Sequence, residues 1–121
     1  KVPSDEEWIM LEQYLGMDAS DASNSGFRGT EEGDQLKALV TDVPSWDGMN
    51  TVEFSALPAG YRFNFGSFAG ISDEALFWSQ TASGSSLWTR GLESGNPQIE
   101  RTLKSGGFGA SIRCLKSNEN E

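Results

Sequence analysis

The first apolar pattern in the chain is a helical stripe near the N-terminus. Trp8, Leu11 and Leu15 recur at intervals of three and four residues, which places them on one face of a helix. Ser4 and Glu7 have the spacing of a capping box, in which each side chain bonds the free backbone N–H of the other residue. The pattern therefore predicts a helix that opens directly after Ser4 and ends close to the glycine that follows Leu15.

The middle of the chain is mostly polar. Residues 17–33 are mainly Asp, Ser, Gly, Asn and Glu, which predicts a long surface loop. Residues 35–40 are ambiguous between a short strand and a helical turn, because their apolar positions also suit a helical stripe. Residues 41–50 carry the Pro, Asp, Gly and Asn of a loop, from which Trp46 is large enough to fold back and bury part of its ring.

The second half of the chain has the pattern of β-strands. Short runs of aromatic and β-branched residues alternate with clusters of Gly, Ser, Asn and Pro, which is typical of an antiparallel meander. A helix followed by irregular loops and a late antiparallel sheet predicts one α+β domain over residues 1–116, with a polar tail at 117–121. The expected strands are 61–65, 76–81, 87–92, 99–103 and 110–115.

The periodic apolar residues of these elements predict one contiguous core. Phe77 and Trp78 are neighbours along a strand, so we expect them to be buried from opposite faces of the sheet. Arg62 and Arg113 lie inside apolar runs, which predicts that both make structural hydrogen bonds and do not bind a ligand. The predicted core comprises Trp8, Leu11, Leu15, Leu57, Phe77, Trp78, Leu92, Ile112 and Leu115.

The charge of the chain is strongly acidic and unevenly distributed. Its 121 residues suit a single domain, and the net charge of −9 arises in the first half, where residues 1–53 hold 12 acidic and 3 basic residues. A chain of this charge repels phosphate backbones, so we expect no nucleic-acid partner. Its apolar stretches are too short to cross a bilayer, so we also expect no membrane span in this chain.

The residue types needed for most catalysis are scarce. The chain has no histidine and a single cysteine, which excludes Ser-His-Asp and Cys-His arrangements, histidine-ligated metals and thiolate clusters. The acidic residues between positions 18 and 34 miss the spacing of an EF-hand loop, which favours a hydrated loop over a calcium site. We therefore expect a protein that is not an enzyme, with no cofactor and no metal site.

Trp88 and Arg90 are the candidate ligand-binding residues. Alternation along the predicted strand puts both side chains on one face, where an aromatic plane beside a guanidinium group can stack on a sugar or protein ligand. Packing in the core, or stacking of the two groups on other residues of the chain, is the alternative interpretation. The sequence alone leaves both open.

Four short motifs in a fixed order carry a family resemblance. Residues 2–8 read VPSDEEW, residues 54–62 read FSALPAGYR, and a WSQT segment at 78–81 precedes a final SIRC at 111–114. In this order they resemble the Fibrobacter succinogenes major paralogous domain, found in surface and secreted proteins, lipoproteins among them, of gut and related bacteria. The resemblance also favours extended chain over residues 35–40.

The resemblance implies a fold and a class of function. Members of this family look like relatives of the C-type-lectin-like fold, in the version shared with formylglycine-generating enzymes. Those enzymes use a pair of cysteines that bind copper, and this chain lacks such a pair; the calcium motifs of C-type lectins are absent too. The leading hypothesis is an extracytoplasmic, non-catalytic binding or adhesion module for an unknown protein or glycan ligand. An accessory domain of a larger surface protein is the first alternative, and a divergent enzyme of the formylglycine-generating superfamily is the second.

The family resemblance also implies a role for Cys114. Similar proteins carry a cysteine a few residues before the VPTxxEW segment, positioned to pair with the cysteine of the SIRC motif. We therefore expect Cys114 to be unpaired here, to lie near Lys1, and to form a disulfide with a cysteine upstream of Lys1 in the parent protein. The alternative is a buried free thiol that behaves as a small hydrophobic side chain.

Overall fold

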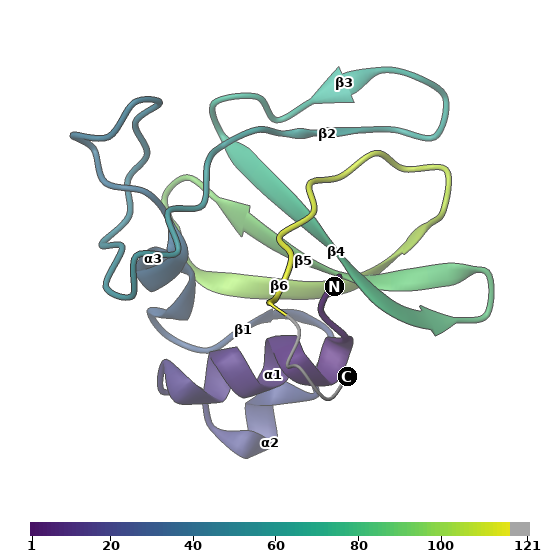
Figure 1. The fold of residues 1–121 in the computed structure, drawn as a ribbon, viewed down its shortest axis with the longest axis horizontal. Helices are drawn as coiled ribbons and strands as arrows, with labels where there is room; N and C mark the ends of the chain where they lie inside the picture. The colour runs from purple at the N-terminus through teal and green to yellow at the C-terminus, as the bar shows by residue number, and fades with distance from the viewer. Residues whose placement is uncertain (117–121) are drawn as a thin grey trace.

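The computed structural model describes residues 1–116, so the predicted polar tail at 117–121 lies outside the described residues. A four-stranded antiparallel sheet, in the order β1-β6-β5-β4, forms the centre of the domain. Figure 1 shows helices α1 and α2 on one side of this sheet in the view and a hairpin, β2–β3, on the other. The α+β class is confirmed. The elements are α1 (Asp5–Tyr14), α2 (Ala19–Ala22), β1 (Gly26–Arg28), α3 (Glu32–Leu36), β2 (Tyr61–Arg62), β3 (Phe68–Ala69), β4 (Glu74–Ser83), β5 (Ser86–Glu93) and β6 (Asn96–Ser105).

Helix α1 begins as the sequence predicts. The Glu7 backbone N–H donates to the Ser4 hydroxyl at 3.1 Å, and the Ser4 N–H donates to the Glu7 carboxylate at 2.9 Å, so both halves of the capping box are present. At the other end Gly16 has a φ of 118°, a left-handed conformation that glycine adopts without steric cost. The sequence signals at both ends of this helix are therefore confirmed.

The segment between α1 and the first predicted strand is more ordered than the sequence suggests. Residues 17–33 hold α2 and β1, and β1 pairs with β6 through the register Phe27 with Glu100. The prediction of a surface loop is wrong for this part, because Arg28 and Glu32 are buried there. The strand favoured over 35–40 is also wrong in large part, since α3 ends at Leu36 and only an isolated bridge follows.

The sheet follows the three central strands of the predicted meander and departs from it at both ends. Strands β4, β5 and β6 cover the three central predicted strands and pair antiparallel, with bulges that shift the register once in each pair. The predicted strand at 61–65 shortens to the two residues of β2. Residues 110–115 were predicted as a strand, but among the described residues they make only the isolated bridge between Phe77 and Ser111. That prediction is wrong.

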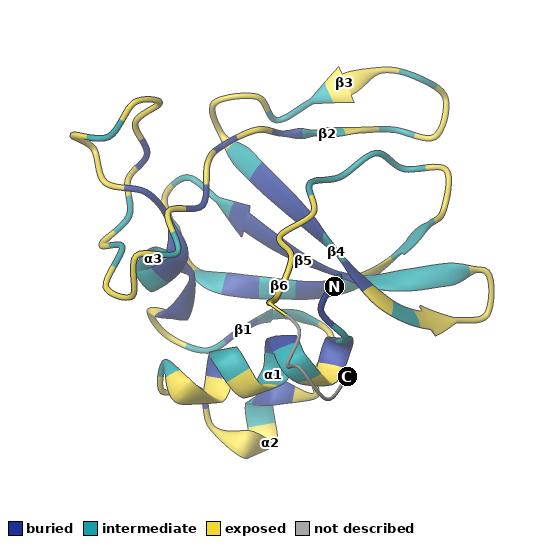
Figure 2. Ribbon diagram, viewed as in Figure 1, coloured by how far each residue is buried: buried dark blue, intermediate teal, exposed yellow. Residues whose placement is uncertain are grey.

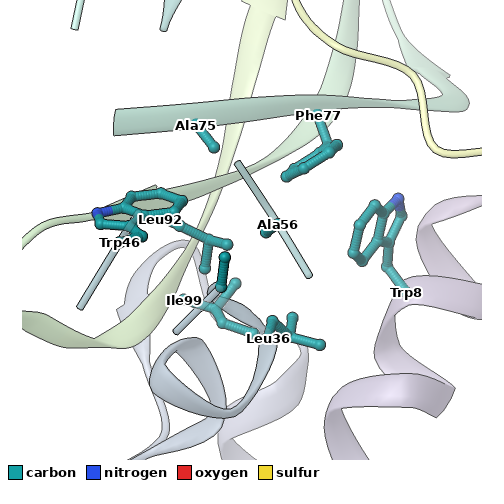
Figure 3. Close-up of a cluster of buried hydrophobic side chains, with 9 residues drawn as sticks. Trp8, Leu36, Trp46, Ala56, Ala75, Phe77, Leu92 and Ile99 are labelled. Atoms are coloured by element: carbon teal, nitrogen blue, oxygen red, sulfur yellow. The ribbon is translucent and has the colours of Figure 1, made fainter. Parts of the chain in front are cut away.

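The core lies between α1, α3 and the sheet (Figure 3). Trp8 contacts the ring of Phe77 with centroids 5.8 Å apart, and Leu92 packs in the same cluster, as predicted. Trp46 folds back into this cluster as well, where its indole N–H donates to the Ser94 hydroxyl at 2.8 Å.

The remaining residues of the predicted core differ in how far they are buried. Leu11 and Leu15 are partly buried against the cluster, and Trp78 is half-buried on the face of the sheet opposite Phe77. Three members of the predicted core are exposed instead, because the segments that carry them join no sheet that would bury alternate residues. These three are Leu57, Ile112 and Leu115.

Candidate functional site

Arg90, one of the two predicted ligand-binding residues, is buried between the sheet and α1. Its side chain is 1% exposed, and its Nε donates to the Glu12 carboxylate at 2.7 Å. One terminal nitrogen lies 2.8 Å from the Asp5 carboxylate. Trp88 shares the helix-facing side of β5 and is half-buried, with the Arg101 guanidinium carbon 3.7 Å from the centre of its ring. The prediction that Arg90 is available to a ligand is therefore wrong, and the intramolecular alternative describes both residues.

Arg90 belongs to a buried ionic network on α1. Glu12 is fully buried and also accepts two hydrogen bonds from Arg28, at 2.7 and 3.0 Å. Asp5, two turns earlier on the same face of the helix, accepts from Arg101 at 2.6 Å. Each arginine also donates to a backbone carbonyl, so the charges of the network are matched within the chain. The arrangement is structural.

The Asp5 carboxyl of this network makes the stability of the fold depend on pH. Burial raises the pKa of the Asp5 carboxyl, but hydrogen bonds and charge from Arg101 and Arg90 outweigh burial and lower that pKa below its ordinary value of 3.8. Since the folded state holds this proton more weakly than the unfolded chain, the stabilisation is complete well above pH 3.8 and disappears as the pH falls through the lowered value. We expect the free energy of unfolding, measured by urea titration, to fall steeply below pH 4 on this account. Asp5→Asn should flatten that part of the profile, and an unchanged slope in the variant would contradict this assignment.

A second buried charge, Lys37, lies at the other end of the core. Its side chain is fully buried, and its Nζ donates to Asp47 at 3.0 Å and to the backbone carbonyls of Glu93 and Asn96 at 2.8 and 3.2 Å. An oxygen of the Asp34 carboxylate also lies 3.0 Å from this Nζ. This lysine therefore ties the 41–50 loop to the turn between β5 and β6.

The largest exposed aromatic surface is on the hairpin β2–β3, which we call the aromatic hairpin (residues 61–71). Phe63 and Phe65 stack with their rings 5.0 Å apart and nearly parallel, at 7°. Phe65 and Phe68 are 75% and 72% exposed, and Figure 2 shows β3 among the exposed segments of the chain. A turn holds the hairpin, in which the Gly66 N–H donates to the Phe63 carbonyl at 3.0 Å. Exposed rings on a turn that the backbone fixes form a ready contact surface.

A shallow cavity of about 230 Å³ adjoins this hairpin. Arg62, Phe68 and residues 109–111 are among the residues that line it. Arg62 and Phe68 are cross-strand partners, which puts both side chains on the same face of the hairpin. The Arg62 guanidinium makes no hydrogen bond or ion pair with any residue that the structure describes. The prediction of structural hydrogen bonds is thus wrong for Arg62, whereas Arg113 confirms it by donating to the Phe54 carbonyl at 2.6 Å.

The other face of the hairpin covers a small acidic pocket of about 50 Å³. Tyr61 lies there beside Glu74, Glu93 and Glu100. Burial and the charge of Glu93 raise the pKa of Glu74, and burial does the same for Glu100. Burial and the three glutamates also raise the pKa of the Tyr61 hydroxyl. Within residues 1–116, no group of acidic or cysteine side chains has the geometry to hold a metal ion.

Glu74→Gln is expected to stabilise the protein at neutral pH. Folding raises the pKa of Glu74, so the ionised carboxylate destabilises the folded protein at pH values above this raised pKa. The cost disappears as the pH falls toward the ordinary pKa of 4.5. The melting temperature of the variant should exceed that of the parent at pH 8, and the difference should vanish near pH 4.5. Glu53→Gln, on an exposed residue, is the control. A Glu74→Gln variant that melts lower at pH 8 would show that the carboxylate is stabilising.

Cys114 lies next to the N-terminus. Lys1 and Leu115 exchange two main-chain hydrogen bonds, each 2.7 Å long, so the position predicted for Cys114 is confirmed. The thiol is unpaired and exposed, which excludes the alternative of a buried thiol. It borders an apolar groove of about 300 Å³ whose walls include Trp8 and Phe54.

The upstream partner of Cys114 stays a prediction. In the present chain a thiol reagent should titrate one cysteine per molecule without denaturant, because Cys114 is exposed. In a longer chain that includes an upstream cysteine, the same titration of the native protein should find neither thiol, since the pairing would close the two ends of the domain. Persistence of both thiols in oxidising buffer would rule the pairing out.

The comparison with protein families gives a clear result. The sequence pattern of the Fibrobacter succinogenes major domain matches residues 1–116, which is almost the whole chain, and the chain therefore belongs to this family. No curated protein and no solved structure matches the chain. In the part of the chain that is described, no helix is long and apolar enough to cross a membrane.

Proposed function

We propose that this chain is a non-catalytic binding or adhesion module of an extracytoplasmic bacterial protein, and that the aromatic hairpin contacts its protein or glycan ligand. The observation that carries the proposal is the exposure of Phe65 and Phe68 beside an open cavity. Burying such rings releases water from a large apolar area, which makes aromatic side chains frequent anchors of binding sites.

The scaffold supports this role. The buried ionic network and the Lys37 cluster join α1, the loops and the sheet, so the hairpin projects from a rigid body. Its attachment is fixed too, because Arg62 and Gly109 exchange two backbone hydrogen bonds of 2.9 Å. We propose, from the family resemblance, that this scaffold is C-type-lectin-like and that the module forms part of a larger cell-surface or secreted protein.

The test is a binding screen with a matched control. The chain is applied to an array of glycans and host proteins, and each positive ligand is retested with a Phe65→Ala, Phe68→Ala variant. Met10→Ala, Tyr14→Ala is the control, because these two α1 residues are comparably exposed but lie away from the hairpin. We expect the hairpin variant to lose binding and the control to retain it. Equal binding by both variants would refute the hairpin as the contact surface.

The accessory-domain alternative predicts a different fate for the same surface. A neighbouring domain would cover Phe65 and Phe68 without any added ligand. Hydrogen exchange of residues 61–71 in the intact parent protein separates the two proposals, since protection in the absence of ligand favours the accessory role. The divergent-enzyme alternative has less support, because the buried carboxylates of Asp5 and Glu12 are both held by arginines.

A further inference from the structure

Arg62 is exceptional among the arginines of this acidic chain. The chain has 18 acidic residues against 9 basic ones, and four of its five arginines bond a carboxylate or a backbone carbonyl. Those four are Arg28, Arg90, Arg101 and Arg113. Arg62 alone makes no such bond with the residues that the structure describes, although it is surrounded by a chain with an excess of acids. A guanidinium group left unpaired and exposed is available to an external anion.

The side chain of Arg62 runs past Gly109 toward the turn of the hairpin. The first carbons of its side chain pass so close to Gly109 that a Cβ there would lie 3.0 Å from the Cβ of Arg62. One terminal nitrogen reaches toward the turn, 3.5 Å from where a Cβ of Gly66 would stand. Phe68 lies across the hairpin on the same face, so a charged donor and an exposed ring flank one cavity.

The cavity lining also offers neutral hydrogen-bonding groups. Ala110 and Ser111 line it, and the backbone N–H and C=O of Ala110 and the hydroxyl of Ser111 have no partner among the described residues. The volume of about 230 Å³ is below the roughly 300 Å³ at which sites for whole small-molecule ligands begin. An open cavity of this size suits one unit of a longer polymer.

These features together select a chemical class of ligand. The face of an aromatic ring packs against the apolar C–H face of a sugar, and unpaired donors and acceptors suit its hydroxyl groups. A guanidinium group matches a carboxylate in two parallel hydrogen bonds. We propose that the cavity between Arg62, Phe68 and residues 109–111 binds a carboxylated sugar unit of an acidic polysaccharide, a uronic acid. This inference rests on the proposed function and names the ligand of the same surface.

The net charge of the domain does not oppose this contact at close range. The excess acid lies in residues 1–53, whereas residues 54–121, which carry the cavity, hold six acidic and six basic residues. At physiological salt, exposed charges more than about 8 Å apart are largely screened from each other. Among the described residues that line the cavity, Arg62 is the one that carries a charge.

The test compares a charged and an uncharged form of the same polymer. Oligosaccharides of polygalacturonate carry a free carboxylate on each ring, and their methyl esters keep the rings while removing the charge. We expect calorimetry to detect binding of the free acid and a roughly 10- to 100-fold weaker affinity for the ester, the loss expected for one charge-assisted contact. Arg62→Met and Phe68→Ala should each weaken binding of the free acid. Lys116→Met, which removes an exposed charge outside the cavity, should leave it unchanged.

Each result supports or overturns the inference. Equal binding of acid and ester, or an Arg62→Met variant that binds the acid as well as the parent chain does, would show that the carboxylate is not recognised. Tighter binding to dextran sulfate than to polygalacturonate, sensitive to Arg62→Met, would assign the cavity to sulfated sugars instead and overturn the uronic acid. Failure of all three polymers, with Phe65 and Phe68 still required for another ligand in the array, would end this inference and leave the proposed function standing. Melting temperatures of the variants within a degree or two of the parent exclude unfolding as the cause.

Discussion

Glu12→Gln is expected to destabilise the protein by about 3–5 kcal/mol, the loss found when one partner of a buried ion pair is removed. The side chain keeps its size, but the charge that Arg28 and Arg90 share is gone, and both guanidinium groups stay buried. Domains of this size are stable by only about 5–15 kcal/mol, so the variant should lose a large share of its stability. Urea unfolding followed by circular dichroism measures the change.

The control for this prediction is on the same helix. Glu6→Gln removes an equal charge from an exposed position of α1, where the loss of a favourable interaction with the helix dipole is about 0.3–1 kcal/mol. A double-mutant cycle with Arg90→Met adds a second criterion, because the two substitutions should couple strongly if Glu12 and Arg90 act through one ion pair. A loss for Glu12→Gln no larger than that for Glu6→Gln would contradict a structural role for the network.

The parts of the fold that the sequence predicted are those with local signals. The capping box at Ser4 and the stripe through Trp8 place α1 correctly, and alternating runs place β4, β5 and β6. The strand expected at 110–115 failed because periodicity reports which residues suit a strand, but the pairing partner decides whether a ladder forms. Residues 17–33 were read as solvated because their composition is polar, whereas the structure buries the charges of Arg28 and Glu32 by giving each a bonding partner.

The candidate site was misplaced for a related reason. Alternation correctly put Trp88 and Arg90 on one face of β5, but it does not say which face meets the helix. The decisive fact is non-local, since Glu12 lies 78 residues away from Arg90 in the sequence. One signal was present, because Glu12 follows Trp8 by four residues and so interrupts the apolar face of α1 with a charge. An acid on an apolar stripe predicts a buried cation opposite.

The aromatic hairpin was missed because Phe63 and Phe65 belong to the strand predicted over 61–65. Phe68 lies beyond that predicted strand, and sequence alone gives no sign that the strand is only two residues long. The turn at 63–67 leads the chain away from the sheet, which leaves two rings in solvent. The sheet face nearest the hairpin then holds a pocket of glutamates, so the rings cannot turn inward onto an apolar surface.

Lys37→Met is expected to cost about 2–3 kcal/mol of stability and to loosen the loop that carries Trp46. Methionine matches the length of lysine but donates no hydrogen bond, so the carbonyls of Glu93 and Asn96 lose the cation that they face, and leaving such groups unpaired costs about 1–3 kcal/mol. The loss should be smaller than for Glu12 because the side chain of Asp47 is 45% exposed and regains water.

Two measurements separate this effect from a general one. Amide hydrogen exchange should rise in residues 38–53 of Lys37→Met, since this loop is tied to the turn between β5 and β6 through the lysine, and should change little in α1. Burial raises the pKa of Asp47, but its bonds to the Gly95 N–H and to Lys37 outweigh burial and lower that pKa below its ordinary value. Removing the lysine should therefore move the pKa upward in an NMR titration. Lys116→Met supplies the control for the loss of one positive charge at an exposed position. If Lys37→Met has the same melting temperature as Lys116→Met, and its amides in residues 38–53 exchange as slowly as those of the parent, the lysine does not hold the loop.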